Sequence, residues 1–262
     1  MSRYYRSFLE ESGVAYTART TAFATATAIT DTTILGALNT FDLGLISNSL
    51  DTKMKAVYPM VGGTSTTCKY NFMNAVDSNS AFRLQFFGGG TFSNNGYQPN
   101  GTNAYADTFY SQTTQGDNVN SGHISYYSRT NSNGNEVEIG AAGTGNTLLR
   151  ARTSGISYTL INQSGTTSFS DTDSLGFYVA NRTALNVVNG WKAGVKKVTD
   201  TTSSSGLTFY NLYLAALNIS YSQNYSTKQC AFASIGSGLT DVEATTFSTL
   251  VQNMQITLSR NV

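Results

Sequence analysis

The last part of the chain has apolar side chains at helical spacing. Apolar positions between residues 244 and 258 follow one another at steps of three or four, which places them on one face of a helix. These positions are Ala244, Phe247, Val251, Met254 and Leu258. Thr240 and Glu243 form a capping box, in which the two side chains satisfy backbone amides at a helix start. The pattern predicts a capped amphipathic helix over residues 241–258.

A second set of apolar residues with helical spacing predicts a helix over about residues 32–48, which Thr30 or Asp31 can cap. Its apolar positions are Ile34, Leu38, Phe41 and Leu45. The preceding stretch TAFATATAITD predicts a shorter helix, and residues 1 to about 19 are interpreted as an arm. Because a helix of about 27 Å exceeds the gap of about 10 Å between packed sheets, we expect the two helical ends to pack together outside the sheets.

Short runs of strand-forming residues fill the chain from about residue 55 to residue 232. They are separated by turn signals at intervals near the eight to twelve residues of sandwiches and barrels. Hairpin turns are expected at the Asn-Gly pairs Asn95-Gly96, Asn100-Gly101, Asn133-Gly134 and Asn189-Gly190. This organisation predicts a mainly β fold with a two-sheet antiparallel sandwich in residues 53–262, preceded by an arm and short helices in residues 1–52.

Charge is sparse in this chain of 262 residues. Asp, Glu, Lys and Arg make up 12% of it, and the net charge is +1. No basic run is present, so we expect no nucleic-acid partner. The start of the chain lacks a secretory apolar core, and no stretch approaches the about 20 apolar residues of a membrane span, so we expect no membrane insertion. Cys68 and Cys230 are expected to be reduced thiols.

Several long phrases of the chain resemble one protein family in their residues and in their order. They are TKMKAVYPMVGGT at 52–64, AFRLQFFGGGTFSNNGYQPNGTNAYADT at 81–108, ISYYSRTNSNGNEVEIGA at 124–141, FYVANRTALNVVNGWKAGVKK at 177–197 and AFASIGSGLTDVEATTFSTLVQNMQITLSRNV at 231–262. The family is that of phage virion proteins of the concanavalin A-like lectin/glucanase (laminin-G-like) jelly-roll superfamily. The resemblance covers nearly everything after about residue 22.

The resemblance implies a two-sheet jelly roll and a non-enzymatic structural or decorating component of a tailed-phage virion, in the capsid or the tail. Such a protein is assembled in the host cytoplasm, and its partners are other virion proteins and copies of itself. The alternative is a lectin-like module that binds host-surface glycans. Neither hypothesis calls for a cofactor, and the resemblance carries no established set of binding residues.

Glu136-Val137-Glu138 is the sequence feature closest to a glucanase site. Those enzymes resemble one another in acidic residues at i, i+2 and i+4, whose outer pair performs the chemistry and needs carboxyls about 5–5.5 Å apart in retaining enzymes. Here the fifth position is Gly140, and the position two before Glu136 is Gly134. The outer pair is missing, so we expect no catalytic residues and interpret the glutamates as a solvated strand face.

Other polar residues are interpreted as parts of turns and surface. His123 is the single histidine, and we expect it on the surface at a strand start. One histidine with two distant cysteines does not make a zinc site. Asp171-x-Asp173 and Asn131-x-Asn133-Gly134 lack the later glutamate of a calcium loop, so no metal site is predicted.

Candidate residues for glycan or protein contact are aromatic or amide side chains near turns. The selected set is Tyr97, Asn100, Asn103, Tyr127 and Trp191. Tyr126, Tyr210 and Tyr213 are further tyrosines with rings suited to stacking on a sugar. Trp191 follows an expected turn at Asn189-Gly190, where packing over the core edge is favoured over ligand contact.

Overall fold

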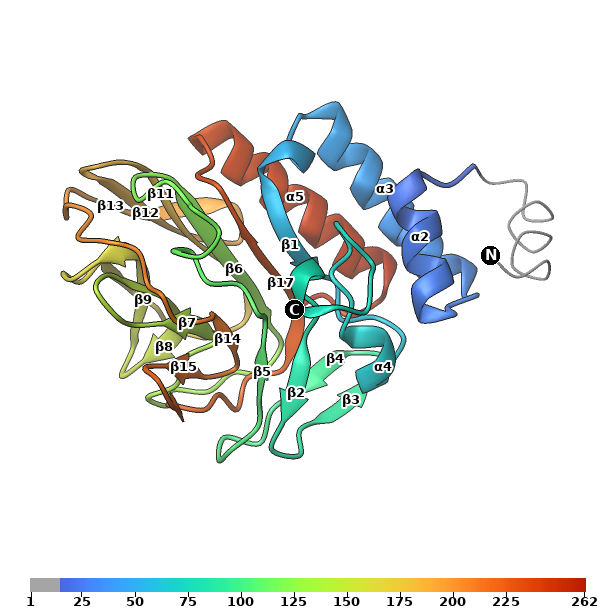
Figure 1. Ribbon diagram of the computed structural model, residues 1–262, viewed down its shortest axis with the longest axis horizontal. Helices are drawn as coiled ribbons and strands as arrows, with labels where there is room; N and C mark the ends of the chain where they lie inside the picture. Colours follow the sequence, from blue (N-terminus) through green and yellow to red (C-terminus); the bar gives the residue numbers. More distant parts are fainter. Residues whose placement is uncertain (1–14) are drawn as a thin grey trace.

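The computed structural model describes residues 15–262 and shows a β-sandwich with a helical layer on one side (Figure 1). Residues 1–14, which include most of the predicted arm, lie outside the described residues. In Figure 1 the helices lie on one side of the molecule, β8, β9, β14 and β15 lie on the other, and β6 and β17 run between them. The predicted mainly β fold with two packed sheets is confirmed.

The first sheet is antiparallel throughout. Its strand order is β13 (Val195–Asp200), β12 (Val187–Lys192), β11 (Gly176–Ala184), β6 (Gly122–Ser128), β17 (Cys230–Gly236), β4 (Gly96–Gln98) and β3 (Thr91–Ser93). One further strand pairs with β17, namely β1 (Met54–Tyr58).

The second sheet consists of mostly shorter strands. Its order is β10 (Ser168–Ser170), β9 (Ile156–Gln163), β8 (Asn146–Thr153), β7 (Ile139–Ala141), β14 (Tyr213–Leu214), β5 (Tyr105–Asp107) and β2 (Gln85–Phe87). A small hairpin of β15 (Leu217–Asn218) and β16 (Ser222–Gln223) joins it beside β7, through a short parallel pairing.

Alternation along the strands divides the apolar residues between two cores. In β6, Ile124 and Tyr126 face the second sheet and belong to the core between the sheets. The next residue, Tyr127, faces the opposite way and belongs to the core beneath the helices. This alternation is the period of two that a strand imposes on its side chains. The first sheet is therefore buried on both faces, which explains why every residue of β6 and β17 is buried.

The helical layer contains α2 (Ala18–Thr27), α3 (Thr32–Ser47) and α5 (Asp241–Thr257). Shorter helical turns are η1 (Asp51–Lys53), α4 (Ser65–Cys68) and η2 (Asn79–Ala81). Asp31 caps α3, and Thr240 and Glu243 form the predicted capping box of α5. Within residues 15–262, each helix is too short or too polar to cross a membrane.

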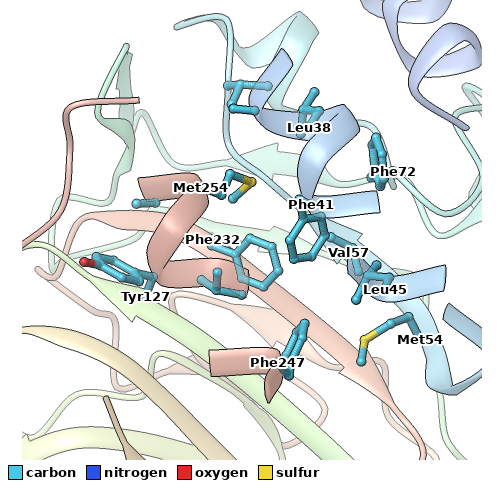
Figure 2. Close-up of a cluster of buried hydrophobic side chains, with 14 of the residues drawn as sticks. Leu38, Phe41, Leu45, Met54, Val57, Phe72, Tyr127, Phe232, Phe247 and Met254 are labelled. Carbon is cyan, nitrogen blue, oxygen red and sulfur yellow. The ribbon is translucent and has the colours of Figure 1, made fainter. Parts of the chain in front are cut away.

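The two helical ends of the chain pack together on the first sheet, as predicted. Phe41 of α3, Phe247 of α5 and Phe232 of β17 meet with ring centroids 5.6–6.4 Å apart (Figure 2). Gly44 allows α3 to approach α5 closely, because a Cβ there would lie 2.4 Å from Cδ2 of Leu250. Gly44 has a low intrinsic helix propensity, but its lack of a side chain lets the two helices pack closely.

Contrary to expectation, none of the four Asn-Gly pairs supplies the two residues of a hairpin turn. Asn100-Gly101 and Asn133-Gly134 lie in loops between strands of different sheets, and the other two pairs are displaced from the turn. Asn189 and Gly190 lie inside β12, and the turn after that strand is made by Ala193 and Gly194, both with positive φ. Gly190 is required by packing, because a Cβ there would lie 2.5 Å from Oγ1 of Thr159 on the second sheet. In the β3–β4 hairpin, Ser93 pairs with Gly96, so the turn residues are 94 and 95.

Candidate functional site

Three aromatic rings from adjacent strands form a row on the outer face of the second sheet. Phe87 of β2 stacks on Tyr105 of β5, with ring centroids 4.9 Å apart and planes 18° apart. Tyr105 stacks in turn on Tyr213 of β14 at 4.7 Å and 28°. The neighbouring residues Phe86, Ala106 and Leu214 pack into the core between the sheets. We call Phe87, Tyr105 and Tyr213 the aromatic row.

The aromatic row is open to solvent. Phe87 is 38% exposed, and Tyr105 and Tyr213 are half-buried. Within the described part of the chain, α2, α3 and α5 cover the first sheet and leave this face of the second sheet without a helix. Because β2 is the last strand of its sheet, no strand of residues 15–262 lies beside the face of the Phe87 ring that points away from Tyr105.

Polar side chains flank the aromatic row. Asp107 of β5 lies opposite Tyr213, and its Oδ2 accepts a hydrogen bond from Nδ2 of Asn211 at 3.2 Å. Partial burial raises the pKa of Asp107. Burial and the Asp107 charge raise the pKa of Tyr213 to about 12, so its hydroxyl stays protonated at neutral pH. Rings beside a carboxylate and an amide suit a ligand that is apolar on one side and carries hydroxyls on another.

Asn100 and Asn103, two of the predicted contact residues, lie in the exposed loop at one end of the aromatic row. Nδ2 of Asn100 donates to the carbonyl oxygen of Gly88 and to Oδ1 of Asn103, both at 2.8 Å. Its Oδ1 accepts from the backbone amides of residues 102, 103 and 104. Asn100 therefore shapes this loop and holds it against the residue that follows Phe87.

The other three predicted contact residues are buried, which corrects their assignment to a contact surface. Tyr97 packs between Phe86 and Phe92 in the core between the sheets. Tyr127 lies beneath α5, where its hydroxyl donates to Gln252. Trp191 lies in the core beneath the helices, in agreement with the packing interpretation. Strand alternation turned each ring inward, where burial of a large apolar ring is favourable.

Sequence patterns alone did not point to Phe87 and Tyr105. One signal for them exists, because Phe86 and Phe87 are consecutive in a strand and one of the two rings must face outward. Tyr213 was among the tyrosines considered for stacking on a sugar. Its place in the row depends on the pairing of β14 with β5. This pairing joins residues that are more than 100 positions apart in the chain, so local sequence does not reveal it.

Glu136 and Glu138 are buried, so the predicted solvated strand face is wrong. Lys228 lies between them, with its Nζ 2.7 Å from Oε2 of Glu136 and 3.1 Å from Oε1 of Glu138. The side chains of Lys228 and Glu138 have no exposed surface. Hydrogen bonds and the Lys228 charge hold the pKa of Glu136 below its usual range despite burial, and the two glutamates raise that of Lys228. A buried charge requires such a partner.

His123 is also buried, which contradicts its predicted surface position. Its Nδ1 donates to the carbonyl oxygen of Ser237 at 2.6 Å, and its Nε2 lies 3.2 Å from Oγ of Ser234. Its ring packs against Phe247 of α5. Burial lowers the pKa of His123 to about 4, so the imidazole is neutral at physiological pH.

The Asp171-x-Asp173 pair holds an ammonium group. Nζ of Lys192 lies 2.6 Å from Oδ1 of Asp171 and 2.9 Å from Oδ1 of Asp173. Ser157 and Tyr178 donate to the other oxygen of Asp171. The pair is therefore part of an ion cluster that joins β12 to the loop before β11, in keeping with its interpretation as a turn.

Comparison with known proteins concerns the fold alone. No family model matches the chain, and no curated protein matches it. Three solved structures with a similar fold share 10–13% identity with it. A receptor binding domain aligns over 78% of this chain and 52% of its own length, with a TM-score of 0.50.

Two further similar structures have lower scores. A botulinum neurotoxin type C structure, described as dependent on two ganglioside molecules for cell entry, aligns over 79% of this chain and 53% of its own length with a TM-score of 0.49. Domain 4 of the arabinanase AbnA from Geobacillus stearothermophilus, solved with arabinotriose, aligns over 75% of this chain and 98% of its own length with a TM-score of 0.43. At 10% sequence identity, the alignment with the receptor binding domain indicates a shared fold and does not extend to function.

Proposed function

We propose that this protein is a lectin-like module that binds a carbohydrate at the aromatic row. The observation that carries the proposal is a set of solvent-accessible rings, Phe87, Tyr105 and Tyr213, on an uncovered sheet face. Sugars present both C–H groups and hydroxyls. Aromatic rings provide an apolar surface for the former, and polar groups at the rim orient the latter.

The polar groups beside the row supply both hydrogen-bonding roles. Carboxylate oxygens of Asp107 accept hydrogen bonds from sugar hydroxyls, and Asn211 has an amide that both donates and accepts. The hydrogen bond between these two side chains fixes their positions before a ligand arrives. Such preorganisation reduces the entropic cost of binding. The open ring face of Phe87 is the stacking position, because the row's inner ring faces are occupied by one another.

We further propose that the protein binds without hydrolysing its ligand. The only sequence feature close to a glucanase motif, Glu136 and Glu138, is engaged by Lys228 in the interior. A glycosidase needs two carboxyls on either side of an accessible glycosidic bond. The burial of Glu138 supports a role in binding without hydrolysis. To test this role, the protein is incubated with an oligosaccharide that it binds, and the products are analysed. Released sugar would contradict it.

A glycan array followed by calorimetry on the bound sugar tests the proposed site. Phe87→Ala removes the ring with the open face and should weaken binding by about tenfold or more, since a ring that packs against a ligand contributes on the order of 1–2 kcal/mol. Phe209→Ala is the matched control, because Phe209 is a 55% exposed phenylalanine outside the row. Wild-type protein that binds no glycan, or Phe87→Ala protein that binds as tightly as wild type, would refute the site.

A structural or decorating part of a tailed-phage virion is the second candidate function. Its support is the resemblance in phrases that run from residue 52 to residue 262, and it is compatible with glycan binding on the same particle. In this role the protein is located in the virion after assembly in the host cytoplasm, and it contacts other virion proteins and its own copies. Mass spectrometry of purified particles should then find it at a fixed stoichiometry. Particles that lack it would exclude this role.

A further inference from the structure

Lys228 and the two glutamates form an enclosed cluster that bridges the two sheets. Lys228 lies two residues before β17 of the first sheet, and Glu138 lies one residue before β7 of the second. The side chains of Lys228 and Glu138 are fully buried, and that of Glu136 is 11% exposed. One ammonium faces two carboxylates, so the ionised cluster has a net charge of −1 in a water-poor site, which is costly to maintain.

We propose that Lys228 and Glu138 form an intramolecular amide bond, with Glu136 as the proton-transfer group. The amine nitrogen lies 3.1 Å from Oε1 of Glu138, which holds the nucleophile beside the carboxyl group that it would attack. The same nitrogen lies 2.7 Å from Oε2 of Glu136, which suits direct proton transfer. The site excludes water, which would otherwise favour the free amine and acid.

The two oxygens of Glu138 have different surroundings that match the two roles in amide formation. Oε2 accepts a hydrogen bond from the backbone amide of Ala151, so it is placed to become the oxyanion and then the amide oxygen. Oε1 faces Lys228 and accepts from the hydroxyl of Ser226 at 3.1 Å, so it is placed to leave as water.

The proton and charge balance closes within the cluster. Glu136 takes one proton from the ammonium of Lys228 and passes it to Oε1 of Glu138. The lone pair of Nζ then attacks Cδ of Glu138, and a C–N bond forms. Glu136 moves a second proton from nitrogen to Oε1, the C–O bond breaks, and one water leaves. The charge is −1 before the reaction, from two carboxylates and one ammonium, and −1 afterwards, on Glu136 alone.

The surroundings also satisfy the product. The new amide N–H points to Glu136, whose carboxylate keeps its hydrogen bonds from the backbone amide and hydroxyl of Thr227 and from the hydroxyl of Ser132. The amide oxygen keeps the backbone donor of Ala151. The reaction thus removes one buried charge of each sign and leaves both polar groups of the new amide with a partner. The hydroxyl of Ser226 loses Oε1 of Glu138 as its acceptor and keeps the hydrogen bond from the backbone amide of Lys228. The amide bond joins the segments that lead into β7 and β17.

The mass of the intact, denatured wild-type protein tests the proposal directly. It should be lower than the mass of the sequence by one water molecule, and a proteolytic digest should contain a branched peptide that joins Lys228 to Glu138. Folded wild-type protein at its full sequence mass after prolonged incubation would overturn the proposal. A link from Lys228 to Glu136 would overturn the assigned roles.

Variants separate this bond from other losses of water. Lys228→Met cannot form the bond, and Glu136→Gln retains both bonded residues without the proton-transfer group, so both should keep their full sequence mass. Glu243→Gln is the matched control, because it breaks the partly exposed ion pair of Glu243 with Lys53 and should leave the water loss intact. A water loss that persists in Lys228→Met would refute the assignment, and one that persists in Glu136→Gln would refute the role of Glu136.

Discussion

The guanidinium of Arg260 donates a hydrogen bond to the carbonyl oxygen of Met60, 200 positions earlier in the chain, at 2.7 Å. The same buried side chain also donates to the carbonyl oxygens of Pro59 and Ala231 and to the side chain of Gln255. Arg260 therefore ties the last residues of the chain to the end of β1 and to β17.

Replacement of Arg260 by methionine should lower the free energy of unfolding by about 3 kcal/mol or more. The change leaves several buried carbonyl oxygens without a donor, and each such loss costs about 1–3 kcal/mol. Chemical denaturation followed by circular dichroism measures the effect. Lys197→Ala is the control, because Lys197 is exposed in β13 and its loss should change stability by less than about 0.5 kcal/mol. Equal stabilities of the two variants would contradict the role of Arg260.

Acid should destabilise the protein through His123. Burial lowers the pKa of His123 to about 4 in the folded state, whereas a histidine in an unfolded chain titrates near 6.5. As the pH falls from about 6.5 to 4, the unfolded state binds a proton that the folded state does not. The free energy of unfolding should therefore fall by about 1.4 kcal/mol per pH unit over this window from this residue alone.

The contribution of His123 is measured as the difference between wild type and His123→Gln in urea denaturation at several pH values. Carboxylates titrate in both proteins and cancel in that difference. The wild type should lose stability more steeply than the variant between pH 6.5 and 4. Parallel pH profiles would show that His123 is protonated equally in both states.

Gly36 and Gly44 of α3 should respond differently to alanine. A Cβ at Gly36 meets no atom within 4 Å, so Gly36→Ala should stabilise the protein by about 1 kcal/mol through helix propensity. A Cβ at Gly44 would lie 2.4 Å from Cδ2 of Leu250 on α5. Gly44→Ala should therefore stabilise the protein much less, because the cost of moving the Leu250 side chain offsets the gain in helix propensity. Thermal and chemical denaturation of the two variants gives the comparison. A larger gain at Gly44 than at Gly36 would contradict the close approach of the helices.

Gly190→Ala should destabilise the sandwich by about 1–3 kcal/mol, which is typical of overpacking in a core. The added methyl would lie 2.5 Å from Oγ1 of Thr159 and 2.9 Å from Cγ1 of Val198. Denaturation of the double variant with Thr159→Ala provides the test, because removal of the Thr159 hydroxyl should recover part of the loss. If the two changes are additive, the clash with Thr159 is not the cause.

The sequence by itself determined the features that depend on residues close together in the chain. The period of Leu38, Phe41 and Leu45 and the capping box of Thr240 and Glu243 predicted two helices to within one or two residues, because helical hydrogen bonds and caps are local. Alternation and turn spacing predicted the sandwich. A single apolar face on each terminal helix indicated that the two would pack together.

The tertiary structure alone decided which polar and aromatic residues are buried. Glu136 is neutralised by Lys228, 92 positions later, and His123 is covered by α5. Strand pairing turned Tyr97 and Tyr127 inward and placed Phe87, Tyr105 and Tyr213 in one outward row. The physical reason is that a strand offers two equivalent faces. The partner strands and the covering helices, which come from distant parts of the chain, determine which face meets solvent.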